Sequence, residues 1–126
     1  MIIDNPGVPH AGDKSVASGS GNRIAHNRLE HLPRTAVSVL SSDAANYSHT
    51  NVVEYNDVQF TNLETVDSSA IETTGRHRKE TGNLIQYNRI RDTGGLGTDT
   101  EGKFRTPYRT WGIQLDEYTS GTVVKG

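Results

Sequence analysis

Cysteine is absent from this chain of 126 residues, which excludes both a disulfide framework and a thiolate metal site. Apolar residues make up only 32% of the chain, and a two-layer globular domain of this length normally needs more to fill its core. No apolar run approaches the roughly 18 residues of a membrane-spanning helix, and no basic-then-apolar signal region follows Met1. The composition therefore favours a narrow, repetitive core and gives no indication of a membrane partner.

Neither positive nor negative charge dominates the chain. Thirteen basic residues stand against 15 acidic residues, which gives a formal net charge of -2, and neither sign is gathered into a block. Binding to nucleic acid depends on clustered lysine and arginine that neutralise phosphates. We therefore expect no nucleic-acid partner.

What the chain does contain is a repeat. The segments 22–29, 51–58 and 83–90 share one pattern: Asn, any residue, aliphatic, any residue, aromatic or His, Asn, any residue, aliphatic. A fourth copy begins at Thr122. The aliphatic anchor falls at Ile24, Val53, Ile85 and Val124, so the repeat is about 30 residues long and lengthens along the chain. This pattern predicts one structural unit stacked on itself, with loops that grow on one side.

The second Asn of each copy predicts a bend between two short strands. Asn27, Asn56 and Asn88 can adopt the left-handed conformation of a sharp turn, and their side chains can bond nearby backbone groups. Stacked in adjacent coils, they would form a ladder of amides. His26 occupies the position of Tyr55 and Tyr87, so we interpret it as structural.

A further strand follows each copy, over residues 35–39, 69–73 and 112–116, and all three alternate with a period of two. The pattern turns Val37, Ile71 and Ile113 inward. Segments 61–68 and 93–110 are longer loops that should emerge on one side. The expected fold is all-β, a right-handed parallel β-helix of about three coils over residues 21–126. A loop-rich segment over residues 1–20 precedes it.

Several motifs carry a resemblance to a known family. Asn22-Arg-Ile-x-His-Asn-x-Leu, Asp67-Ser-Ser-Ala-Ile and Trp111-Gly-Ile-Gln-Leu-Asp116 resemble the pectate-lyase-like right-handed β-helix proteins, in their glycoside-hydrolase branch. The resemblance implies a polysaccharide or oligosaccharide substrate, an extracellular or periplasmic location, and a catalytic acid pair at Asp67 and Asp116. One departure is Glu72, whose position is commonly aromatic in that pattern. Family proteins also have more coils, so we expect missing coils of a longer β-helix as partners.

Strand geometry suggests a different acid pair. Glu72 aligns with Gln114, which places it about 8 Å from Asp116, within the separation of about 6.5–9.5 Å found in inverting glycosidases. The register thus favours Glu72 with Asp116, whereas the resemblance favours Asp67 with Asp116. We give preference to the resemblance and propose Asp67 with Asp116 as the acid pair, with Glu72 as the substitute if the register proves the better guide.

Other side chains near these acids are candidates for binding a sugar chain: Arg76, His77, Tyr108, Trp111, Glu117 and Tyr118. No cofactor or metal is expected for hydrolysis. A calcium-dependent polysaccharide lyase is one alternative, in which Asp and Glu oxygens hold Ca²⁺. A non-catalytic carbohydrate-binding or structural β-helix module is another.

Overall fold

The computed structural model describes residues 16–17, 19–41 and 47–126, and over these residues the chain is all-β with no helix. Most of the predicted loop-rich segment, residues 1–15 and 18, therefore lies outside the described part. No helix in that part is long and apolar enough to cross a membrane. The strands are β1 (Val16–Ala17), β2 (Arg23–Ala25), β3 (Arg28–Glu30), β4 (Val37–Val39), β5 (Val52–Glu54), β6 (Asp57–Thr61), β7 (Ser68–Thr74), β8 (Leu84–Gln86), β9 (Arg89–Thr93), β10 (Gly97–Thr98), β11 (Phe104–Arg105), β12 (Thr110–Asp116) and β13 (Val123–Lys125).

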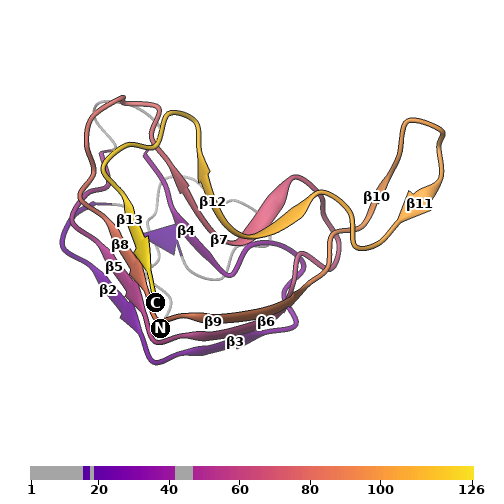
Figure 1. The fold of residues 1–126 in the computed structure, drawn as a ribbon, viewed down its shortest axis with the longest axis horizontal. Coiled ribbons are helices and arrows are strands. Elements are labelled where there is room, and N and C mark those ends of the chain that lie inside the picture. The colour runs from indigo at the N-terminus through magenta and orange to yellow at the C-terminus, as the bar shows by residue number, and fades with distance from the viewer. Residues whose placement is uncertain (1–15, 18, 42–46) are drawn as a thin grey trace.

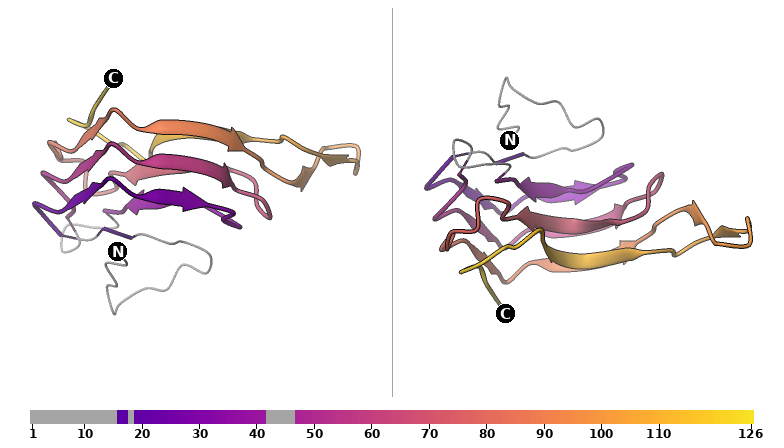
Figure 2. Two further views of the ribbon diagram at one scale, coloured as in Figure 1. Left: turned by 90° about the horizontal axis from the view of Figure 1, so that it is seen from below. Right: turned by 90° about the horizontal axis from the view of Figure 1, so that it is seen from above.

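Three parallel sheets contain all of these strands except β10 and β11 (Figure 1). Sheet I has the order β1-β4-β7-β12, sheet II has β2-β5-β8-β13, and sheet III has β3-β6-β9. The chain passes from sheet I to sheet II to sheet III and then returns to sheet I in the next coil, so that strands of successive coils stack on one another (Figure 2). This arrangement is consistent with a β-helix-like class.

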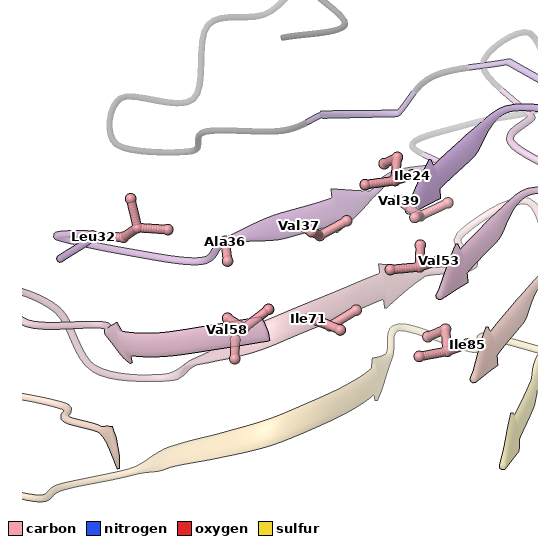
Figure 3. Close-up of a cluster of buried hydrophobic side chains, with 10 residues drawn as sticks. Ile24, Leu32, Ala36, Val37, Val39, Val53, Val58, Ile71 and Ile85 are labelled. Atoms are coloured by element: carbon pink, nitrogen blue, oxygen red, sulfur yellow. The ribbon is translucent and has the colours of Figure 1, made fainter. Parts of the chain in front are cut away.

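The repeated sequence pattern sets the register between coils. Ile24 pairs with Val53, Val53 with Ile85, and Ile85 with Val124. The first three of these side chains are buried and belong to the hydrophobic core, as Figure 3 shows. The predicted register is therefore confirmed for all four residues, and the interior position for the first three, whereas Val124 is 44% exposed.

Sheet I adds a second interior row. Val37 pairs with Ile71, and Ile71 with Ile113. Val37 and Ile71 are fully buried, and Ile113 is half-buried and packs against the same cluster. The predicted inward direction of these three side chains agrees with this packing.

A sharp bend separates sheet II from sheet III in every coil. The residue in the left-handed conformation is the aromatic or His before the repeated Asn: His26, Tyr55 and Tyr87 have φ of 58°, 53° and 52°. Our expectation that the Asn itself adopts this conformation is therefore wrong by one position. A left-handed ring residue turns its side chain out of the bend, and the Asn after it can point inward.

The amide ladder at this bend is confirmed. Asn27 donates from Nδ2 to Oδ1 of Asn56 at 2.9 Å, and Asn56 donates in the same way to Asn88 at 2.9 Å. A second ladder connects Asn22 to Asn51 at 3.0 Å and Asn51 to Asn83 at 3.2 Å. Both satisfy buried polar groups between coils, as close packing requires.

The connections from sheet III to sheet I vary in length. The loop between β6 and β7 is short, whereas the one between β9 and β12 carries the antiparallel pair β10–β11, and both emerge on one side (Figure 1). Asp99 stabilises this hairpin, because its carboxylate accepts bonds from the backbone N–H of Glu101 and Lys103 and from Arg105. The backbone bond from Lys103 and the Arg105 guanidinium lower the pKa of Asp99. The predicted long loop is thus a projecting hairpin.

Candidate functional site on sheet I

Strands β7 and β12 carry the candidate acids. Asp67 directly precedes β7, Glu72 lies within it, and Asp116 is the last residue of β12. The pairing of Glu72 with Gln114 and of Thr74 with Asp116 confirms the predicted alignment of the two strands. Glu72 and Asp116 are thus one strand and two residues apart, or about 8 Å by strand geometry.

Asp67 is not brought together with Asp116. Its backbone N–H donates to the carbonyl of Arg109 at 2.8 Å, which places it where β12 begins, whereas Asp116 is where β12 ends. Seven residues of extended chain separate Arg109 from Asp116, so Asp67 and Asp116 lie about 20 Å apart along the strand direction. Asp67 is exposed, and Arg109 lies 3.8 Å from its carboxylate. The two acids that the resemblance implies therefore cannot act on one glycosidic bond within this chain.

The environment of Glu72 is made by the preceding coil. The Ser38 hydroxyl donates to one carboxylate oxygen at 2.9 Å, and the Thr35 hydroxyl donates to the other at 3.3 Å. Both hydroxyl residues are fully buried. Ser38 is the register partner of Glu72, so alternation and register together could have identified this contact from the sequence. Thr35 precedes β4, and its contact could not be predicted in this way.

Asp116 is exposed at the open edge of sheet I. Its Oδ1 accepts from the backbone N–H of Glu117 at 2.8 Å, and its Oδ2 lies 3.4 Å from Nε2 of Gln114. In both bonds the carboxylate oxygens act as acceptors. Asp116 is therefore within reach of solvent and of a ligand.

Several predicted binding residues gather beyond this end of the strands. Arg76 forms a two-point ion pair with Glu117, and this pair raises the pKa of the Arg76 guanidinium. The guanidinium of Arg78 lies 4.5 Å from the centre of the Tyr118 ring. Tyr118 is 67% exposed and leaves most of its surface available to a ligand.

His77 lies in the same turn. Its Nδ1 accepts from the backbone N–H of Lys79 at 2.9 Å, so in the neutral ring Nε2 carries the proton, and this buried atom has no hydrogen-bond partner among the described residues. Burial and the charge of Lys79 lower the pKa of His77. The ring also packs edge-on against Tyr47 at 4.5 Å. The repeat pattern did not indicate Tyr47, because this residue lies outside every repeated position.

The remaining candidates lie at the opposite end of β12. Trp111 is 41% exposed near the start of the strand. Tyr108 packs against the long loop: a Cβ at Gly97 would lie 3.0 Å from Tyr108 Cδ1, and one at Gly95 would lie 2.2 Å from its carbonyl oxygen. Tyr108 therefore holds the base of the hairpin in place.

The calcium-dependent alternative would need several oxygen ligands close together. The described part of the chain has no group of three or more His, Cys, Asp or Glu residues able to hold a metal ion. Of the two adjacent acids, Glu117 is already paired with Arg76. Comparisons of the chain with protein-family models, with curated proteins and with solved structures give no match.

Proposed function

We propose that this chain is part of a right-handed parallel β-helix of the pectate-lyase-like kind, and that it hydrolyses glycosidic bonds of a polysaccharide on the outer face of sheet I. The three parallel sheets and their regular rotation along the chain support the proposed fold. The motifs that end in Asp116 support the class of reaction.

One observation carries the proposed mechanism. The register of β7 and β12 sets Glu72 about 8 Å from Asp116, and this separation leaves room for a water between a carboxyl group and the sugar. We assign the pair Glu72 and Asp116 to inverting hydrolysis and leave Asp67 out of the reaction.

The two environments suggest the two roles. Asp116 is assigned as the general base, because it is exposed at the open edge of sheet I, where a water molecule can reach its carboxylate. Glu72 is the general acid. Its neighbours Ser38 and Thr35 are hydroxyl groups, which can accept as well as donate a hydrogen bond.

The aromatic residues suggest how a sugar chain lies. Both Trp111, near the start of β12, and Tyr118, two residues beyond its end, are exposed, one on either side of Gln114 along the chain. Aromatic faces pack well against the apolar faces of sugar rings. A polysaccharide that runs along β12 would contact both rings and cross the Glu72–Asp116 pair.

The test is a comparison of three variants on a panel of plant and bacterial polysaccharides, with release of reducing ends as the measurement. Glu72→Gln and Asp116→Asn should each lower kcat by about 10²–10⁴-fold. Asp67→Asn is the matched control and should keep wild-type turnover. Full activity in Asp116→Asn, or loss of activity in the folded Asp67→Asn variant, would contradict the assignment.

A second candidate is a non-catalytic carbohydrate-binding or structural module. One contact favours it: both oxygens of Glu72 already bind hydroxyl groups of the preceding coil, which is a structural role. Under this alternative no polysaccharide is cleaved, and Glu72→Gln lowers the melting temperature. Binding to a glycan array without turnover would then identify the module.

A further inference from the structure

A column of stacked rings runs along the outside of the bend between sheets II and III. The His26 and Tyr55 rings lie 5.3 Å apart, centre to centre, with an angle of 1° between their planes. The Tyr55 and Tyr87 rings lie 5.2 Å apart with an angle of 20°. Tyr55 is 48% exposed and Tyr87 is 50% exposed, so reagents in solution can reach both phenols.

The backbone holds these two tyrosines in place. Each adopts a left-handed conformation between two paired strands, with Glu54 opposite Gln86 before the rings and Asp57 opposite Arg89 after them. The next residue in each coil belongs to the amide ladder. The ring positions are therefore set by the register between coils.

We propose that Tyr55 and Tyr87 form a modification site at which a one-electron oxidant couples them into dityrosine. Each phenol loses one electron and its hydroxyl proton and becomes a phenoxyl radical. The two radicals join through a carbon–carbon bond between ring positions ortho to oxygen, and the two displaced ring hydrogens move to the oxygens and restore both hydroxyl groups. With hydrogen peroxide as the terminal oxidant, two phenols and one peroxide give one dityrosine and two water molecules.

Proximity selects this pair. Among the described residues, Tyr55 and Tyr87 form the one stacked pair of tyrosines. Tyr118 is more exposed, at 67%, but the group over its ring is the Arg78 guanidinium. If exposure decided the reaction, Tyr118 would couple between molecules. If the stack decides it, the product forms within one chain at positions 55 and 87.

The cross-link would join two successive coils by a covalent bond. It joins residues that are distant in sequence and already adjacent in the fold, so it restricts the unfolded chain more than the folded one. The oxidised protein should therefore unfold at a higher temperature than the untreated protein, provided that the linkage is the one proposed.

The experiment treats the dilute full chain with a peroxidase and hydrogen peroxide. Dityrosine fluorescence, gel mobility and mass spectrometry of proteolytic peptides are then measured. The expected product migrates as a monomer, has lost two hydrogen atoms, and contains one cross-linked peptide pair with Tyr55 and Tyr87. Its yield should not depend on protein concentration.

Three variants complete the test. Tyr55→Phe and Tyr87→Phe keep the ring stack but lack one phenol, so each should lose the intramolecular product. Tyr118→Phe is the matched control and should form it as the wild type does. Dimers linked through Tyr118 as the main product, persistence of the intramolecular product in Tyr55→Phe, or absence of the linkage once both tyrosines have been oxidised would each overturn the proposal.

Discussion

The side-chain carbonyl of Asn88 accepts two hydrogen bonds from Asn56, one from the backbone N–H at 3.0 Å and one from Nδ2 at 2.9 Å. Asn56 in turn accepts the same two bonds from Asn27 and also donates to the carbonyl of Ile24. Asn56 thus connects its own coil to both neighbours. The ladder supplies polar contacts at the bend, where the bonds between paired strands are interrupted.

Asn56→Ala should lower the free energy of unfolding by about 2–4 kcal/mol, because it leaves several buried donors and acceptors without partners. Asn27→Ala is the matched control at the end of the ladder. Its side chain makes two bonds, to Ala25 and Asn56, and it is only half-buried, so a loss of about 1 kcal/mol is expected. Urea denaturation of both variants measures the difference, and equal losses would argue against a cooperative ladder.

The interior row gives a second pair of variants. Ile85 is 1% exposed, whereas Val124, its partner in the next coil, is 44% exposed. Ile85→Ala should cost about 2–5 kcal/mol through lost burial and a cavity. Val124→Ala should cost less than about 1 kcal/mol, as for an exposed position. Thermal unfolding measures the melting temperature of both variants. A larger decrease for Val124→Ala than for Ile85→Ala would show that this end of the row is covered in solution.

Close approach of the backbone at Gly75 gives a third prediction. A Cβ there would lie 2.5 Å from Cα of Thr119 and 2.8 Å from the carbonyl oxygen of Tyr118, and neither backbone atom can move without shifting the next coil. Gly75→Ala should therefore destabilise the protein by about 1–3 kcal/mol. Gly112→Ala is the control, because its Cβ would meet only a side-chain carbon of Ile90 at 3.7 Å. Melting curves measured by circular dichroism compare Gly75→Ala with Gly112→Ala. Equal melting temperatures of the two variants would contradict the close contact.

Low pH should weaken the hydrogen bonds of Glu54 with Gln86 and Arg23 on sheet II. Hydrogen bonds from Gln86 and then Arg23 lower the pKa of Glu54 below its ordinary value of 4.5. A carboxyl whose pKa is lower in the folded state stabilises the fold above the unfolded value, and this contribution is lost as the pH falls through the folded value. The melting temperature should therefore decrease when the pH is lowered below about 4.5.

Glu54→Gln tests this assignment. Its melting temperature should lie below that of the wild type at neutral pH, and the difference should shrink as the pH decreases below about 4.5. Glu64→Gln is the matched control at an exposed loop position and should behave as the wild type does throughout. A constant difference between Glu54→Gln and the wild type at all pH values would show that the carboxylate charge is not the cause.

The sequence by itself determined the repeat and the contacts between equivalent positions of neighbouring coils. A spacing of about 30 residues with aliphatic anchors predicted the row Ile24, Val53, Ile85 and Val124, and the repeated Asn predicted the amide ladder. Both predictions are confirmed because neighbouring coils pair in register. A residue at the same place in the repeat must then lie against its own counterpart.

Only the tertiary structure decided the features that depend on backbone conformation and on contacts between different repeat positions. The left-handed residue is Tyr55 rather than Asn56, since the bend turns the ring outward and leaves the amide inside. Asp67 lies at the far end of the strand pair from Asp116, because distance along a strand grows by about 3.3 Å per residue whatever motif surrounds the acid. The sequence could supply the acids, but the pairing of β7 with β12 decided which of them can meet.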